Sequence, residues 1–250
     1  MYNPFTLERK TIFVTGASSG IGRSTAIECS RMGAMLIISG RDHERLNETF
    51  EMLDGDKSRH TQLTADLSIQ DEITRLVEEL PSLDGIVHCA GYTKTLPFQF
   101  VNKDDLTAIM QVNFMAPTLI TQSLVKKKKL NKDASIVFIS SVSGVFCTAV
   151  AGSLYSASKG AVNGVVKAMA VDLASKGIRV NSVNPGMIDT AIFSKGVITQ
   201  DQLEEDTKKY PLKRYGKPAE VAFAAIYLLS DTSKWITGTN LLIDGGLTLL

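Results

Sequence analysis

Residues 15–22 read Thr15-Gly16-Ala17-Ser18-Ser19-Gly20-Ile21-Gly22 and join an apolar, β-branched run to a helical pattern. Glycines are needed where a chain turns sharply out of a strand and where a pyrophosphate must approach the main chain closely. The helix that follows presents unpaired N–H groups and a partial positive charge, which favour a bound anion. The spacing G-x-x-x-G-x-G differs from the commoner G-x-G-x-x-G. Taken alone, the stretch indicates either a phosphate-binding loop or a simple tight turn.

Strand and helix patterns alternate on both sides of this loop. Short apolar runs typical of buried parallel strands lie at residues 11–15, 35–39, 85–88, 135–140 and 178–184, with a last one near 241–244. Helical periodicity marks residues 21–32, 42–53, 70–80, 153–176 and 219–229. The alternation predicts an α/β fold: one Rossmann-like domain over residues 1–250, with a doubly wound parallel sheet flanked by helices and right-handed crossovers. A ligand is then expected at the carboxyl ends of the strands.

The composition excludes several classes of protein. The 250 residues carry 27 basic and 26 acidic side chains, and this near-neutral balance does not indicate a nucleic-acid or a membrane partner. Three scattered cysteines without a C-x-x-C argue against a disulfide framework and against a metal site, and they fit a reducing compartment. No signal-peptide pattern begins the chain, and the longest apolar stretch is about half a bilayer span. We therefore expect a cytoplasmic protein.

The end of the second predicted strand bears on the choice of cofactor. It reads Ser39-Gly40-Arg41, whereas an acidic residue near this point would bind ribose hydroxyls and repel a 2′-phosphate. Arg41 offers a guanidinium suited to bidentate contact with a phosphate. The sequence therefore favours NADP(H) over NAD(H). The neighbouring Asp42 counts against this choice, and a plain surface arginine is the alternative.

The chemistry is predicted to centre on Tyr155-Ser156-Ala157-Ser158-Lys159. Tyr155 and Lys159 are four residues apart and so share one helix face. A free tyrosine, with a pKa of about 10, is a poor base at neutral pH. A fixed cation nearby is expected to lower that pKa toward the useful range. Ser140-Ser141 ends a buried strand, so a hydroxyl there can donate to a substrate oxygen.

The chain as a whole resembles the short-chain dehydrogenase/reductase family, with a pattern closest to its 3-ketoacyl-carrier-protein reductases. The resemblance rests on residues in the family's order over nearly the whole length: the loop 15–22, Asp66-Leu67, Ala90-Gly91, Asn113, Ser141, Tyr155, Lys159, Pro185-Gly186, Thr190, Thr237-Gly238 and Asp244-Gly245-Gly246. It implies an oxidoreductase that moves a hydride between NADP(H) and a carbonyl or alcohol. Tyr155 would be the general acid/base.

The resemblance also implies roles for single residues. Asp66 would bond the adenine amino group beside the main chain of Leu67, and Ile188 and Thr190 would contact the carboxamide. Asn113 would hold a water that carries protons from Lys159 to solvent. The implied catalytic residues are Asn113, Ser141, Tyr155 and Lys159. The implied cofactor-binding residues are Gly16, Ser18, Ser19, Gly20, Ile21, Gly22, Arg41, Asp66, Leu67, Ala90, Gly91, Tyr155, Lys159, Pro185, Gly186, Ile188 and Thr190.

Two features depart from the family pattern. Cys89 stands where the family has an asparagine that steadies neighbouring backbone, so cofactor affinity or stability is expected to differ; Cys89 itself fits a buried small hydrophobe. The interval from Ser141 to Tyr155 is one residue longer than in many members. Either Ser141 or Ser143 can therefore face the substrate, and the strand end favours Ser141.

The segments that vary within the family predict the substrate pocket. They are residues 92–98, 142–154 and the substrate loop at about 187–214, and they supply Phe146, Val150, Met187, Ile192 and Phe193. This apolar set favours an apolar or modestly polar carbonyl compound, and the family resemblance makes a 3-ketoacyl thioester the best single candidate. Sugar, polyol and steroid-like alcohols are the alternatives, as is packing of the loop without a substrate role.

The basic run Lys126-Lys127-Lys128-Lys129 with Lys132, and Lys176, allows two interpretations. By resemblance it would steer an acidic acyl carrier protein, but lysines are also favourable at any solvated helix end. Apolar or small-residue surfaces at residues 219–229, 153–174 and 241–244 resemble the family's assembly surfaces and predict a homotetramer. A catalytically idle NADP-binding sensor or scaffold is the alternative to an enzyme, disfavoured because all four catalytic residues are present.

Overall fold

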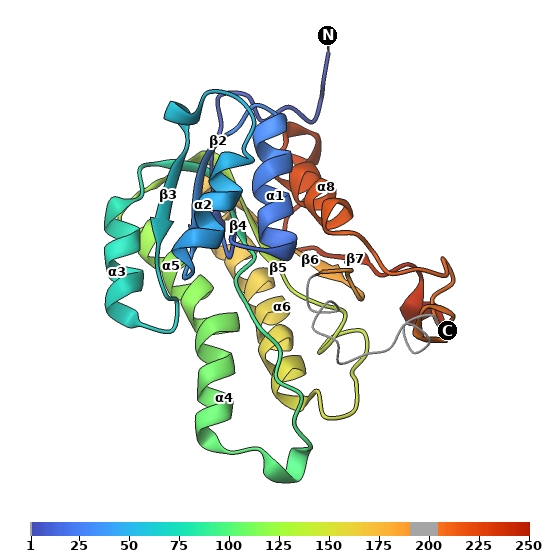
Figure 1. Ribbon diagram of the computed structural model, residues 1–250. Coiled ribbons are helices and arrows are strands. Elements are labelled where there is room, and N and C mark those ends of the chain that lie inside the picture. Colours follow the sequence, from blue (N-terminus) through green and yellow to red (C-terminus); the bar gives the residue numbers. More distant parts are fainter. Residues whose placement is uncertain (1, 191–204) are drawn as a thin grey trace.

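The computed structural model describes residues 2–190 and 205–250 and contains one parallel sheet of seven strands (Figure 1). Its strands are β1 (Thr11–Thr15), β2 (Met35–Gly40), β3 (Thr61–Thr64), β4 (Leu83–His88), β5 (Leu130–Ile139), β6 (Arg179–Pro185) and β7 (Asn240–Ile243). They lie in the order β3-β2-β1-β4-β5-β6-β7. The main helices are α1 (Gly20–Arg31), α2 (His43–Glu51), α3 (Gln70–Glu79), α4 (Lys103–Met110), α5 (Ala116–Lys126), α6 (Ser153–Leu173) and α8 (Pro218–Leu229). The expected fold class is confirmed.

The periodicity of the sequence did not predict every element. The edge strand β3 reads Thr-Gln-Leu-Thr and is exposed at both ends, so it lacks the apolar run that marks a buried strand. The α4–α5 region was also missed as a helical segment. A π-helical turn at Gln111–Met115 joins these two helices, and its wider spacing interrupts the 3.6-residue period.

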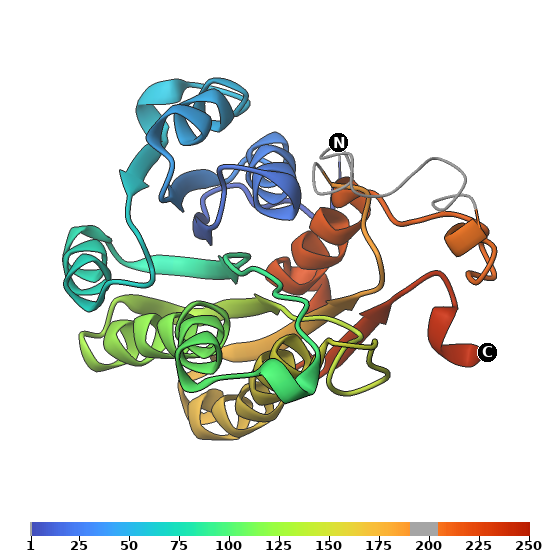
Figure 2. The ribbon, with the colours of Figure 1, turned by 60° about the horizontal axis from the view of Figure 1, so that its bottom comes forward.

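Two layers of helices cover the two faces of the sheet (Figure 2). In β1, Ile12 and Val14 point into a core shared with α1 and α8, whereas Phe13 points into a core shared with α3, α5 and α6. This alternation follows from the period of two along a strand. Since both faces are covered, β1 is apolar on both sides, as the sequence predicted.

The connection from β6 to β7 departs from the expected right-handed crossovers. The chain steps toward one edge of the sheet from β1 to β3 and toward the other edge from β4 to β7. Even so, α8 packs against α1, on the face that the β1–α1–β2 unit uses. The two connections move toward opposite edges of the sheet, but their helices lie on the same face. The β6–α8–β7 crossover therefore has the opposite hand to β1–α1–β2 and is left-handed. Burial of Val221, Ala225 and Ile226 between α1 and the sheet stabilises this arrangement.

The order of the strands reverses between β1 and β4. The helices that leave these neighbouring strands diverge to opposite faces, which leaves a crevice at the carboxyl ends of the strands where ligands bind in open α/β sheets. Among the described residues, no helix is long and apolar enough to span a membrane.

Candidate active site

The loop after β1 forms a cradle in which two glycines, Gly16 and Gly22, have no room for a side chain. Gly16 has φ +67°, and a Cβ there would lie 2.7 Å from the main chain of Ala90. A Cβ on Gly22 would lie 2.2 Å from the carbonyl oxygen of Gly16. Gly20, at φ +53°, brings the start of α1 near Thr190, whose Cγ2 would be 3.4 Å from a Cβ on that glycine. The first turn of α1 carries no acidic residue, so the cradle fits an anionic group such as a pyrophosphate.

The residues expected at the adenosine end lie at the ends of β2 and β3. Arg41 is exposed and directly follows β2. The Asp42 carboxylate accepts from the main-chain N–H of Arg45 at 3.1 Å and caps α2. Asp66 accepts two hydrogen bonds from Ser68, which together with the nearby Arg41 charge hold the pKa of its carboxyl below the usual range. The adjoining Leu67 is buried.

The three expected chemical side chains meet where β5 ends beside α6. Ser141 is 8% exposed, and its hydroxyl hydrogen-bonds the Tyr155 phenol. The Nζ atom of Lys159 lies 5.8 Å from the centre of the Tyr155 ring. Ser143 donates its main-chain N–H to the Ser141 Oγ at 3.1 Å and pairs with Cys147 in a short bridge. This geometry supports Ser141 as the residue that faces the substrate.

The expected lowering of the Tyr155 pKa by Lys159 is wrong for the cofactor-free protein. Burial raises the pKa of the Tyr155 phenol, and the hydrogen bond from Ser141 offsets only part of that rise. Burial also lowers the pKa of Lys159 to about 8, because a charged ammonium loses its hydration inside the protein. Lys159 donates instead to the main-chain oxygen of Ile139 at 2.8 Å. Tyr155 is therefore a protonated acid at neutral pH.

Asn113 lies in the π-helical turn and joins the loop after β4 to α6. Its Nδ2 donates to the main-chain oxygen of Tyr92 at 2.9 Å and to Ser158 Oγ at 3.0 Å, and its Oδ1 accepts from Tyr92 N at 3.0 Å. A Cβ on Gly91 would lie 3.1 Å from Asn113 Oδ1 and 3.6 Å from Lys159 Nζ. Both amide protons are engaged, so a water at Asn113 would have to bond Oδ1 or the main chain. Ser158 was not singled out from the sequence, although it follows Tyr155 by one helical turn.

Thr15 supplies backbone support beside the unusual Cys89. Its Oγ1 accepts from the main-chain N–H groups of Cys89 and Ala90, each at 3.2 Å. Burial raises the pKa of the Cys89 thiol to about 12, so the thiol stays protonated and acts as a small hydrophobe. The end of β4 is thus held from β1.

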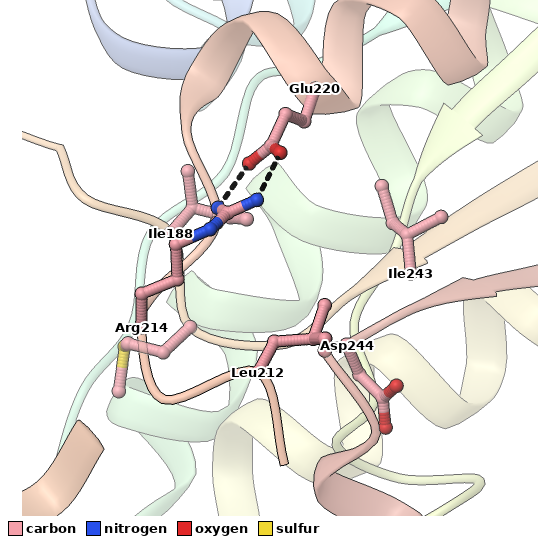
Figure 3. Close-up of a pocket in the computed structure, with 9 residues that line it drawn as sticks. Ile188, Leu212, Arg214, Glu220, Ile243 and Asp244 are labelled. Atoms are coloured by element: carbon pink, nitrogen blue, oxygen red, sulfur yellow. Dashed lines mark hydrogen bonds and ion pairs between the residues drawn. The ribbon is translucent and has the colours of Figure 1, made fainter. Parts of the chain in front are cut away.

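The segment after β6 packs against α8 and β7. A Cβ on Gly186 would lie 3.1 Å from Asp244 Cα, and Ile188 pairs with Gly216 in a short parallel bridge. Beside it lies a pocket of about 260 Å³ (Figure 3). Arg214 binds Glu220 with two hydrogen bonds of 2.8 and 2.6 Å at its rim. The pocket adjoins this segment without including the Ser141–Tyr155 pair.

The expected substrate walls are only partly described. Phe146 and Met187 are 39% and 45% exposed, and Val150 is 97% exposed. Exposed apolar side chains in this position suit a wall that a substrate covers, except that Val150 packs against almost nothing. Ile192, Phe193 and part of the substrate loop at about 187–214 lie outside the described residues.

The basic run does not border this site. It ends at the amino end of β5, and Ser141 follows the carboxyl end of that strand. Leu130 and Phe138 pair with Leu83 and His88 of β4, so the two ends lie about 20 Å apart at the usual rise per residue. Lys129 Nζ donates to the carbonyl oxygens of Val77, Glu78 and Leu80, which caps the end of α3, and Lys127 binds Glu78 at 2.6 Å. Lys176 ends a short helical turn three residues before β6 begins at Arg179, at the same amino-end edge of the sheet. These contacts favour a helix-end role for the run.

The chain is similar to known oxidoreductases over nearly its whole length. The family model described as Enoyl-(Acyl carrier protein) reductase matches residues 16–248. The chain is 34% identical over 245 residues to a glucose 1-dehydrogenase of Gluconobacter oxydans, covering 96% of this chain and 92% of the relative. It is 33% identical over 247 residues to the 3-oxoacyl-[acyl-carrier-protein] reductase FabG of Thermotoga maritima, covering 97% and 99%. A short chain dehydrogenase family protein from Francisella tularensis superposes with a TM-score of 0.84 at 29% identity, covering 96% and 99%.

Proposed function

This chain belongs to the short-chain dehydrogenase/reductase family of NAD(P)(H)-dependent oxidoreductases, and we propose that within it the protein is an NADPH-preferring carbonyl reductase. The observation that carries the proposal is the cluster of Ser141, Tyr155 and Lys159 beside the glycine-lined cradle. The bound nicotinamide supplies the hydride. The chain supplies the proton and holds the carbonyl.

The acid in this reaction is Tyr155. Its raised pKa keeps the phenol protonated at neutral pH, which is the form that gives a proton to an alkoxide forming from a carbonyl. Ser141 donates a hydrogen bond to the same oxygen and stabilises its developing charge. Lys159, which is held by its bond to the Ile139 carbonyl, would bind the nicotinamide ribose and return a proton to Tyr155.

The preference for NADPH rests on Arg41. Its side chain is exposed beside the cradle, and Asp42 is engaged in capping α2, so the nearby carboxylate is already hydrogen-bonded to a main-chain N–H. An arginine at the end of β2 pairs with a 2′-phosphate, where an acidic residue would pair with ribose hydroxyls.

We take a 3-ketoacyl thioester as the substrate class, on the strength of the FabG relatives and the apolar side chains of Phe146 and Met187. The similarity to a glucose 1-dehydrogenase supports a sugar or polyol as the second candidate. An acyl carrier protein as the substrate's carrier would have to reach the carboxyl edge of the sheet, away from the basic run.

A homotetramer in a reducing cytoplasm completes the proposal. Val171 on α6 and Phe223 on α8 are 78% and 54% exposed, and apolar patches of this kind mark assembly surfaces. Much of the apolar surface of α8 is covered by α1 within the chain, which leaves less for a partner than the sequence alone indicated. The three cysteines are free thiols. Light scattering that gives the mass of one chain would contradict the assembly.

The test of the activity is oxidation of NADPH, followed by absorbance, with acetoacetyl-coenzyme A and a panel of aldoses and ketoses. Tyr155→Phe should lower kcat about 100-fold or more, the usual size of an acid catalyst's contribution, and calorimetry checks that the variant still binds the cofactor. Tyr227→Phe, a half-buried tyrosine on α8, is the control and should keep full activity. Cofactor binding without turnover on any carbonyl or alcohol would favour the idle sensor.

A further inference from the structure

We propose that Arg23 and Thr49 are positioning residues that orient the phosphate loop, an inference that rests on the proposed dinucleotide-dependent function. Neither residue belongs to the glycine motif. Arg23 lies on α1 and Thr49 on α2, and both donate to carbonyl oxygens of the loop.

The two carbonyl contacts act on the loop through the planarity of the peptide unit. In a trans peptide the carbonyl of one residue and the N–H of the next point in opposite directions, and the described residues contain no cis peptide bond. Fixing the carbonyl oxygens of Ala17 and Ser18 therefore fixes the N–H directions of Ser18 and Ser19. The Ala17 N–H is already bound to Ser39 O at 2.9 Å. Within the described chain no acceptor takes the N–H of Ser18 or Ser19, which leaves both for a phosphate oxygen.

Thr49 holds the first of these two peptide units. Its side chain is fully buried, and its Oγ1 lies 2.9 Å from Ala17 O and 3.1 Å from Arg45 O. A hydroxyl has one proton to donate, and the shorter contact favours Ala17. The same Oγ1 accepts from Arg23 Nε at 2.9 Å, so the direction of the hydroxyl proton is set by the arginine.

Arg23 holds the second peptide unit and completes the contact with the first. One of its terminal nitrogens lies 2.9 Å from Ser18 O, 3.0 Å from Arg45 O and 2.8 Å from Glu48, so its two protons are shared among three acceptors. The rigid planar fork of a guanidinium lets one side chain reach Ser18 directly and Ala17 through Thr49. A lysine presents its donor protons from one point and cannot reproduce the two separate nitrogen positions that face Thr49 and Ser18.

The contacts also tie the cradle to the neighbouring helix. Arg45, Glu48 and Thr49 all lie on α2, which begins directly after Arg41 and Asp42. A pyrophosphate on the loop and a 2′-phosphate at Arg41 would therefore be presented by one connected unit. Loss of the Thr49 hydroxyl should weaken the loop's contact and leave the Arg41 contact in place.

The experiment compares Thr49→Val, which keeps the shape of the side chain, with Thr49→Ser, which keeps its hydroxyl. Thr49→Val should raise the KM for NADPH about tenfold, the effect of losing one buried hydrogen bond, with kcat at saturating NADPH within about twofold of the parent value. Thr49→Ser should restore the KM. Binding of adenosine 2′-monophosphate, which has no pyrophosphate, should be unchanged in both variants.

Arg23→Lys gives an independent test at a partly exposed position, with Arg31→Lys on the same helix as its control. Arg31 binds only Glu28 among the described side chains and should tolerate the change, whereas Arg23→Lys should raise the KM for NADPH. Equal KM values for Thr49→Val and Thr49→Ser would overturn the proposal, as would equal loss of NADPH and adenosine 2′-monophosphate binding. A parent protein that binds no dinucleotide would instead refute the proposed function.

Discussion

Lys159 and Ile139 form the joint between α6 and β5, with Lys159 Nζ 2.8 Å from the Ile139 carbonyl oxygen. Ile139 is the last residue of β5 and stands two positions before Ser141. Two further bonds join the end of β5 to α6. The Ser140 hydroxyl donates to the Lys159 carbonyl oxygen at 3.2 Å, and Asn163 Nδ2 donates to both Ser140 Oγ and the Lys159 carbonyl oxygen. The spacing of the chemical side chains is therefore fixed by buried hydrogen bonds before any ligand binds.

Lys159→Met should remove a pH dependence of stability. The pKa of Lys159 is about 8 in the folded protein against an ordinary value of 10.5. Between these values the unfolded chain binds more protons, so stability from this group rises with pH and is lowest below pH 8. From pH 7 to 9.5 the gain is about 2 kcal/mol.

Urea unfolding at the two pH values measures this effect without cofactor. The parent protein should gain stability relative to Lys159→Met as the pH rises, and Lys167→Met, on the exposed side of α6, serves as control. An unchanged difference between parent and Lys159→Met would show that Lys159 is not desolvated as the structure has it.

Arg41→Ser should change the cofactor preference. If Arg41 binds a 2′-phosphate, its loss removes a charge-assisted hydrogen bond, and the KM for NADPH rises about 10- to 100-fold. The KM for NADH should stay within about twofold. Arg31→Ser is the matched control, because Arg31 lies at the far end of α1. Equal effects of Arg41→Ser on both cofactors would contradict the assignment.

Gly16→Ala and Gly55→Ala distinguish the backbone strain of a non-glycine residue at positive φ from the steric collision of its Cβ atom. Both positions have a positive φ, +67° and +86°, but a Cβ would collide with Ala90 at 2.7 Å only in the first, whereas Gly55 has nothing within 4 Å. Gly55→Ala should cost about 1 kcal/mol of backbone strain. Gly16→Ala should cost more than about 3 kcal/mol, since the collision with backbone adds to that strain.

Thermal and urea unfolding give the two free energies, and calorimetry with NADPH follows the cradle. Gly55→Ala should bind the cofactor normally, whereas Gly16→Ala should not. Similar stability and binding in the two variants would mean that the loop can move away from Ala90, against the cradle described above.

Reversing the charge of Lys126, Lys128 and Lys132 together should leave kcat/KM within about twofold, even for a substrate carried on an acyl carrier protein. The run lies at the amino end of β5, and a charge about 20 Å away is more than two Debye lengths from the site at physiological salt. A tenfold fall in kcat/KM that high salt also produces in the parent would restore the steering hypothesis.

Lys129→Met should behave differently, because this lysine caps α3 through three carbonyl oxygens. Its loss should lower the free energy of unfolding by about 1–2 kcal/mol while activity at 25 °C is retained. Stability equal to that of the parent would show that water satisfies these carbonyls equally well.

The sequence by itself determined the fold class and the order along the chain of the positions that match the family pattern. Apolar runs of a few residues, each followed by a helical period, admit few arrangements other than a covered parallel sheet. Glycines at positions 16 and 22 required a close backbone approach, and the structure supplies it at Ala90 and at Gly16 itself. These features depend only on residue type and on spacing along the chain, so the sequence alone predicts them.

Only the tertiary structure decided the features that depend on residues far apart in the chain. Burial raises the pKa of Tyr155, although the four-residue spacing to Lys159 predicted the reverse. The placement of the basic run opposite the site follows from strand direction. The support of the phosphate loop by Arg23 and Thr49 joins two helices. Desolvation and long-range hydrogen bonds depend on what packs around a group, and neighbours in space are not neighbours in sequence.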